Sequence, residues 1–208
     1  MAAKLFQTTA TEAEIDQIIR QPMSWDEYLN MPTQYRTADG FVGDIYKVEW
    51  VAGEAIIMMA AMRKAHSNVT YQLERLLRDS LIGAEVYHEV GYRTSEGVLV
   101  PDIIVVEEGG DDDPVWVNRT PLVVIEVLSP STRNYDLLEK SDRYQAWGAR
   151  QSWIADTDGW LVIRENTEDG WKMVALIDSE HPEAQVAVGT TGVVTLRYGD
   201  IFGNLAGQ

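Results

Sequence analysis

The chain contains no cysteine, which excludes disulfides and thiolate metal sites. Basic residues are also scarce, since 17 Lys and Arg stand against 33 Asp and Glu and the formal net charge is −16. A protein that coats nucleic acid needs a basic surface to displace counterions, so this balance counts against such a role. It leaves room for an enzyme with a locally basic groove, because a carboxylate cluster that holds Mg²⁺ would itself add negative charge.

Long apolar runs are missing as well. The sequence has no stretch of 18 or more apolar residues, so no membrane span is predicted. Residues 1–17 lack the apolar core of a secretory signal, and the absence of cysteine fits a reducing compartment. We therefore expect a cytoplasmic protein. Its 208 residues suffice for one hydrophobic core, and we expect an N-terminal arm at 1–22 before a single domain at 23–208.

Hydrophobic patterns predict helices and a hairpin in the first part of the chain. Ser24 and Glu27 form a capping box that opens a short helix. Residues 46–59 are rich in β-branched and apolar side chains and are interrupted at Ala52-Gly53, which predicts a hairpin. In residues 66–81 the apolar positions recur at helical spacing, which predicts one amphipathic helix ended by Gly83.

The middle of the chain is rich in predicted strands. We expect three strands at 85–94, 99–106 and 122–128, and the continuous apolar runs of the last two indicate burial on both faces. A second helix at about 135–147 and a short strand at 152–156 follow, and the β-rich tail has strands near 161–165, 171–177 and 193–197. The order helix–three strands–helix–strand predicts an α/β protein with a mixed sheet and a β-rich C-terminal extension.

Glu126 interrupts an otherwise apolar strand. Strand alternation places it on the same face as Val124 and Leu128. An ionised carboxylate buried there without a partner would be strongly destabilising, so Glu126 needs a cation, a hydrogen-bond donor or a metal. The alternative is that Glu126 lies at the end of its strand and caps a neighbouring loop.

Asp102 is a second isolated acid. It follows Pro101, which marks a strand start or a bulge, and it precedes the apolar run 103–106. Taken alone, the pair could be an ordinary turn. Beside Glu126 on an adjacent strand, Asp102 would complete an oxygen site suited to Mg²⁺ or Mn²⁺. Such an ion can polarise a phosphodiester and lower the pKa of an attacking water.

Lys140 is the third candidate. Within the second predicted helix it shares a face with Leu137 and Tyr144, so we expect it to point at the sheet and to meet Glu126 or Asp102. There it could orient water or stabilise charge on a phosphate. The alternative is a solvated i,i+4 pair with Asp136. Asp102, Glu126 and Lys140 are thus the predicted catalytic residues, and the two acids are the predicted metal ligands.

These motifs together resemble a known family, the Uma-two group of restriction-endonuclease-like proteins in the PD-(D/E)XK nuclease superfamily. The resemblance rests on Pro101-Asp102, on the run EVLSPST at 126–132, and on Asp136, Lys140 and Tyr144. It extends to further segments along most of the chain: 23–29, 49–54, His66, 152–156 and 199–202.

The resemblance implies a restriction-endonuclease-like core and a metal-dependent endonuclease that cuts nucleic acid, DNA more than RNA. It implies Asp102 and Glu126 as ligands of Mg²⁺ or Mn²⁺. It adds Glu49, Glu54 and His66 as further site candidates, although the spacing does not choose between the two glutamates. One departure is that Leu128 stands where the superfamily normally has its lysine, a place that Lys140 could fill from the following helix.

Two other functions stay open. The vacancy at position 128 and the net charge of −16 both favour a binding or assembly module that has lost catalysis. A metal-dependent hydrolase of a smaller phosphate ester is the third possibility. We also expect a homodimer, because symmetric dimers are the commonest soluble oligomers, with the β-rich tail and a loop around Trp116 as its apolar surface.

Overall fold

A mixed six-stranded sheet forms the centre of the computed structural model, which describes residues 18–31, 46–59, 64–110, 113–129 and 132–203. The order in this central sheet is β12-β11-β10-β9-β7-β4, and β9 lies parallel to β10 and antiparallel to β7. Its strands are β4 (Ala84–His88), β7 (Ile103–Glu107), β9 (Val123–Leu128), β10 (Gln151–Asp156), β11 (Trp160–Thr167) and β12 (Gly170–Ile177). The predicted mixed α/β architecture is therefore confirmed.

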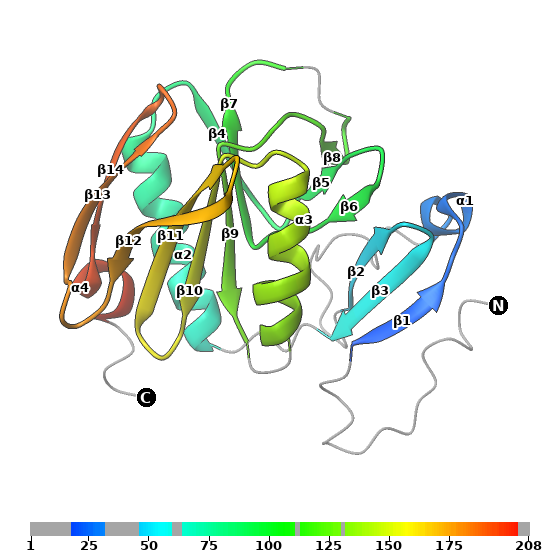
Figure 1. Cartoon of the computed structure of the whole chain (residues 1–208), viewed down its shortest axis with the longest axis horizontal. Coiled ribbons are helices and arrows are strands. Elements are labelled where there is room, and N and C mark those ends of the chain that lie inside the picture. The colour runs from blue at the N-terminus through cyan, green and yellow to red at the C-terminus, as the bar shows by residue number, and fades with distance from the viewer. Residues whose placement is uncertain (1–17, 32–45, 60–63, 111–112, 130–131, 204–208) are drawn as a thin grey trace.

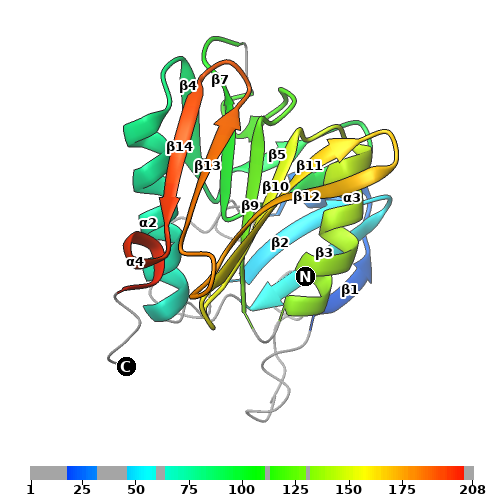
Figure 2. The same ribbon diagram turned by 60° about the vertical axis from the view of Figure 1, so that its left-hand side comes forward.

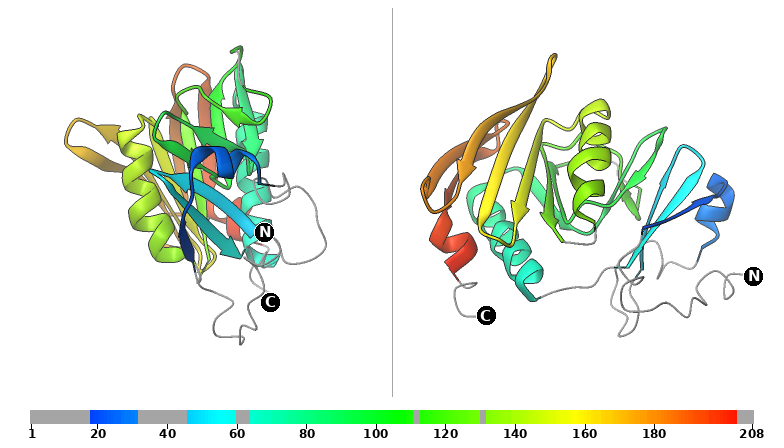
Figure 3. Two further views of the ribbon diagram at one scale, coloured as in Figure 1. Left: turned by 90° about the vertical axis from the view of Figure 1, so that its right-hand side faces the viewer. Right: turned by 60° about the horizontal axis from the view of Figure 1, so that its bottom comes forward.

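A second six-stranded sheet, of order β1-β3-β2-β6-β5-β8, is built largely from the N-terminal part of the chain. Its elements are β1 (Ile19–Pro22), β2 (Tyr46–Val51), β3 (Glu54–Met59), β5 (Gly91–Arg93), β6 (Gly97–Leu99) and β8 (Trp116–Val117), with the short helix α1 (Trp25–Leu29) beside them. The capping box predicted at Ser24 and Glu27 opens α1, as expected. The second sheet lies at the far side of the molecule from the hairpin of β13 (Glu183–Val188) and β14 (Gly192–Arg197) (Figures 1 and 3).

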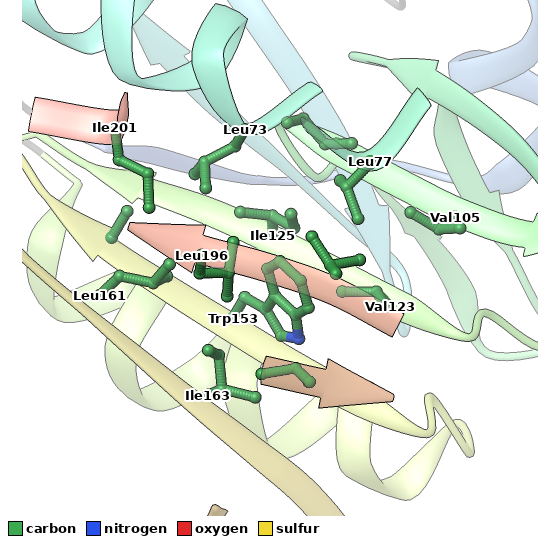
Figure 4. Packing of buried hydrophobic residues seen from close by; sticks show 14 of the residues in the cluster. Leu73, Leu77, Val105, Val123, Ile125, Trp153, Leu161, Ile163, Leu196 and Ile201 are labelled. Carbon is green, nitrogen blue, oxygen red and sulfur yellow. The ribbon is translucent and has the colours of Figure 1, made fainter. Parts of the chain in front are cut away.

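One face of the central sheet packs on the long helix α2 (Lys64–Ser80) (Figure 2). The main core fills this space, with Leu73 and Leu77 of α2 against Ile125 of β9 and Trp153 of β10 (Figure 4). The hairpin β13–β14 and the short helix α4 (Tyr198–Phe202) close the same core through Leu196 and Ile201. The helical spacing from residue 66 onward thus identified the helix that covers this face.

The opposite face is covered by a π-helical segment, η3 (Tyr135–Lys140), which runs directly into α3 (Ser141–Ala146) (Figure 2). A second core joins this helix to both sheets, with Tyr135 and Tyr144 packed near Val124 of β9 and Ile56 of β3. The second sheet therefore shares a core with the η3–α3 face of the central sheet, and polar residues at this junction come from both sheets and from the helix.

Two predicted strands are each divided in two. Residues 85–94 form β4 and β5 in different sheets, and the chain changes direction at Glu89, whose φ is +52°. Residues 99–106 likewise form the end of β6 and most of β7, because Pro101-Asp102 interrupts the ladder between them. The residues around Pro101-Asp102 are all buried, so the sequence pattern is continuous across that break.

Other expectations need smaller corrections. Ile19–Pro22, which we assigned to the N-terminal arm, form the edge strand β1, while residues 1–17 lie outside the described part. Trp116, expected in a loop as an interface anchor, is only 5% exposed and packs against Trp25. The strand β13 was not predicted. No helix in the described ranges is long and apolar enough to cross a membrane.

Gly97 allows β6 to approach β2 closely. A Cβ on Gly97 would lie 2.3 Å from the backbone oxygen of Trp50, which cannot move away as a flexible side chain could. We expect Gly97→Ala to lower the free energy of unfolding by about 1–3 kcal/mol, the usual cost of overpacking. Gly199→Ala is the matched control, since a Cβ there meets no atom within 4 Å. Urea unfolding followed by tryptophan fluorescence measures both, and equal midpoints for the two variants would contradict the close approach.

Candidate active site

The pairing of β7 with β9 brings the two predicted acids together. Ile103 lies opposite Ile125 and Ile104 opposite Val124, and Asp102 directly precedes this ladder while Glu126 directly follows Ile125 on β9. The backbone N–H of Val127 donates to Asp102 Oδ2 over 2.7 Å, which ties the Asp102 carboxylate to the strand that carries Glu126. Both acids are buried, at 6% and 4% exposure.

Glu126 lies in the middle of a buried polar cluster. The ammonium of Lys140 is 2.6 Å from Glu126 Oε1, and the Tyr144 hydroxyl donates to the same oxygen over 2.7 Å. Among the described residues both polar contacts of Glu126 are made by Oε1, which leaves Oε2 available for another ligand. The loop-capping alternative is wrong, because Glu126 lies within β9.

The helical segment turns an unusual set of side chains inward. In a π-helix the backbone bonds from residue i to i+5, so residues five apart come onto nearby faces. Tyr135 and Lys140 are buried together for this reason, and Asp136 is buried with them. Leu137, which ideal α-helical spacing placed on the inward face, is only partly buried. Lys140 and Tyr144 point inward as predicted.

Lys140 is 1% exposed and lies among several acceptors. Besides Glu126, its ammonium is 3.0 Å from Glu49 Oε1 and donates to the carbonyl oxygen of Val100 over 3.0 Å. Asp136 forms a longer ion pair of 3.7 Å. The Asp136–Lys140 pair therefore exists, but it is buried rather than solvated.

The hairpin of β2 and β3 decides between the two glutamates. Glu49 is fully buried, accepts from the Val100 N–H over 2.8 Å and accepts from the Tyr135 hydroxyl. The side chain of Glu54 is 50% exposed and lies 3.9 Å from Arg20. The structure thus brings Glu49 to the cluster and leaves Glu54 outside it.

Asp102 has its own pair of basic neighbours. The Lys47 ammonium is 3.3 Å from Asp102 Oδ1, and His66 Nε2 is 3.2 Å from Asp102 Oδ2. Lys47 comes from β2 and His66 from the first turn of α2, so the second sheet and the long helix meet at this carboxylate.

The electrostatics of the two acids differ. Burial raises the pKa of the Glu126 carboxyl to about 8, and Lys140 offsets this only in part because three carboxyl groups share its charge. Burial would also raise the pKa of Asp102, but Lys47 and the His66 hydrogen bond hold it well below its usual range. For Lys140, burial alone would lower the pKa, and the surrounding acids, Glu126 first, raise it well above its ordinary value.

This donor set fits a hard divalent cation held by few protein ligands. Among the described residues no three His, Cys, Asp or Glu side chains are arranged to hold a metal ion. The candidate donors here are the two side chains of Asp102 and Glu126. Mg²⁺ is usually bound in this way, through one or two carboxylates with the remaining positions filled by water and substrate. Burial is the main cause of the raised Glu126 pKa, and Asp136 and Asp102 add to it, so a bound cation would favour the ionised form of Glu126.

Sequence reasoning missed Lys47, Asp136 and Tyr135 as members of this cluster. Lys47 could have been found, since strand alternation puts it on the same face of β2 as Glu49. Asp136 contributed to the family resemblance and was otherwise considered as a solvated partner of Lys140, not as a member of the site. Tyr135 carried no signal, because its inward position depends on the π-helical turn.

The raised pKa of Glu126 predicts how stability varies with pH. Between its ordinary pKa of 4.5 and about 8 the folded protein binds more protons than the unfolded chain. The stability from this group is therefore complete below pH 4.5 and is lost as the pH rises through about 8. The raised pKa of His66 acts in the same direction from about its ordinary value of 6.5 upward. The free energy of unfolding in chelator should fall by up to about 1.4 kcal/mol per pH unit for each proton involved.

Glu126→Gln should flatten this dependence, most clearly between pH 4.5 and 6.5 where His66 contributes little. Urea unfolding at several pH values measures the slope for the wild type and the variant. Identical slopes would mean that Glu126 titrates at an ordinary pKa.

Comparisons with known proteins identify the family and the fold of the chain. The family model Uma2 (Uma-two), described as "Putative restriction endonuclease", matches residues 25–189. A crystal structure of a "putative nuclease belonging to DUF820" from Anabaena variabilis has a TM-score of 0.66 at 21% identity, covering 88% of this chain and 99% of that one. No curated protein matches. The structural likeness shows a restriction-endonuclease-like fold, and because the family model covers well over half of the sequence, the chain belongs to the Uma2 family.

Proposed function

We propose that this protein is a metal-dependent endonuclease that hydrolyses phosphodiester bonds of nucleic acid, DNA more than RNA. The observation that carries the proposal is that Asp102 and Glu126, two buried acids, lie close together, since Asp102 directly precedes β7 and accepts from the Val127 N–H of β9, next to Glu126. The match to a family described as restriction endonucleases supports nucleic acid over a smaller phosphate ester.

In this proposal Asp102 and Glu126 hold Mg²⁺ or Mn²⁺. The bound ion would supply a Lewis acid for the phosphate and a water of lowered pKa. The chain itself keeps both ligands in place, since the Val127 N–H fixes one oxygen of Asp102 and Tyr144 fixes one oxygen of Glu126. This arrangement costs no reorganisation when substrate binds, which is the basis of electrostatic preorganisation.

Lys140 is a positioning residue in this account. Its ammonium holds Glu126 through an ion pair and the backbone before Asp102 through the Val100 carbonyl oxygen. It also supplies the positive charge that allows several carboxyl groups to be buried together. Removing it should disturb both proposed metal ligands at once.

A binding or assembly module without catalysis is the second candidate. The net charge of −16 favours it, and the buried Leu128 supplies no cation at the position where the superfamily normally has a lysine. In that case the buried cluster would serve only to join the two sheets. A cleavage assay separates these candidates directly.

The assay is nicking of supercoiled plasmid in Mg²⁺ or Mn²⁺. The wild type should nick, and chelator should abolish the reaction. Glu126→Gln, which preserves size and a hydrogen-bonding group, should lower the rate by about 100-fold or more because a metal ligand is lost. Lys140→Ala should also be inactive. Half-maximal binding of Mn²⁺ to this variant should need a higher Mn²⁺ concentration, an effect that a loss of stability alone would not produce.

Two controls sharpen the result. Glu54→Gln changes an exposed glutamate of the same hairpin as Glu49 and should nick at the wild-type rate. Lys140→Arg should remain impaired, because a planar guanidinium does not replace a compact ammonium. Metal-independent nicking, or equal rates for Glu126→Gln and Glu54→Gln, would contradict the proposed function.

We also propose that the protein forms a homodimer. The β-rich C-terminal part presents exposed apolar side chains at Met173 and Val174 on the edge strand β12 and at Val193 on β14, whereas Trp116 is buried. Light scattering at micromolar concentration should give twice the chain mass of 23.4 kDa. A monomeric mass would count against the dimer.

A further inference from the structure

The two buried lysines of the cluster differ in what their ammonium groups can still do. An ammonium has three N–H donors and no acceptor. Lys140 has three acceptors within hydrogen-bonding distance, at 2.6 Å from Glu126 Oε1 and 3.0 Å from both Glu49 Oε1 and the Val100 oxygen. Each of its donors therefore has a partner within the chain, and none is left for a substrate.

The two lysines also differ in their exposure to solvent. The Lys140 side chain is 1% exposed, so a phosphate group would have to displace the helix or the second sheet to touch it. The Lys47 side chain is 12% exposed and that of His66 is 17% exposed. The solvent-accessible side of the cluster is thus the side of Asp102, Lys47 and His66.

The Lys47 ammonium also has N–H groups that are free to bind a ligand. Within the described part of the chain its ammonium has one partner, Asp102 Oδ1 at 3.3 Å, so two N–H groups remain available. A charged ammonium beside a proposed metal ligand lies where negative charge would develop on a bound phosphate.

We propose that Lys47, from the N-terminal hairpin, is the catalytic ammonium that contacts a non-bridging oxygen of the scissile phosphate. It takes the role that Leu128 leaves empty, while Lys140 acts only by holding the carboxylates. This inference rests on the proposed function and adds to it the residue that touches substrate. His66 is a positioning residue, because it holds the other oxygen of the same Asp102 carboxylate.

The test compares single-turnover nicking of supercoiled plasmid in Mn²⁺ by full-length Lys47→Ala, Lys140→Ala and wild-type protein. Lys47→Ala should lose about 100-fold or more in rate, as when one charge-stabilising donor is removed, in an assay well below its midpoint of thermal unfolding. That midpoint should fall, because the buried Asp102 carboxylate loses an ion-pair partner. Added ethylamine should restore part of the rate, because the cavity left at Lys47 opens to solvent. It should not restore Lys140→Ala, whose site is closed. Lys172→Ala, at an exposed lysine on β12, should behave as wild type.

A second measurement does not depend on cleavage. Binding of a short fluorescein-labelled DNA duplex in Ca²⁺ should show a salt dependence whose slope is smaller by about 1 for Lys47→Ala, since one phosphate contact is lost. Lys140→Ala should leave the slope unchanged.

The outcomes separate the two proposals. If the wild type nicks and Lys47→Ala nicks equally well, only the role of Lys47 is overturned. The same holds if Lys47→Ala loses rate, but ethylamine does not restore the rate and the slope of the salt dependence does not change. Rescue of Lys140→Ala instead of Lys47→Ala would overturn it too. If the wild type neither nicks plasmid nor binds the duplex, the proposed function fails and this inference fails with it.

Discussion

The ammonium of Lys140 is the interaction on which the rest of this structure depends. It lies at the junction of three elements, where it pairs with Glu126 of the central sheet, Glu49 of the second sheet and Asp136 of its own helix. Burying so many carboxyl groups together would be strongly unfavourable without a shared cation. Because the same ammonium bonds the Val100 oxygen, it also fixes the backbone just before Asp102. A single buried charge thereby links the packing of the two sheets to the geometry of both proposed metal ligands.

The apolar core and the charged cluster lie on opposite faces of the central sheet. The face of the central sheet toward α2 is apolar apart from the buried Gln151, with Trp153 and Ile125 at its centre. All the charged chemistry lies on the other face and at the strand ends, where β7, β9 and the hairpin of β2 and β3 meet. One side of the cluster is sealed by Tyr135 and Tyr144, while the side with Lys47 and His66 retains access to solvent. Such an arrangement suits a site that must hold ligands rigidly and still admit a phosphate.

The sequence carried enough information to find the cluster but not to complete it. Glu126 was detectable because an acid in an apolar strand needs a partner, and the inward face of Lys140 followed from its spacing to Tyr144. The choice of Glu49 over Glu54 could not be made, because it depends on how the hairpin packs against a helix far along the chain. The π-helical turn that brings Tyr135 inward leaves no periodic signal. The strand break at Pro101 was hidden because burial continues on both sides of it.

The central claim is that Asp102 and Glu126 together form a metal site supported by Lys140. The most direct measurement is anomalous X-ray scattering from crystals of the protein soaked in Mn²⁺. We expect one ion in contact with carboxylate oxygens of both Asp102 and Glu126, with Lys140 still paired to Glu49 and with waters completing the coordination. Absence of an ion between these two carboxylates at saturating Mn²⁺, or an ion bound elsewhere on the chain, would contradict it.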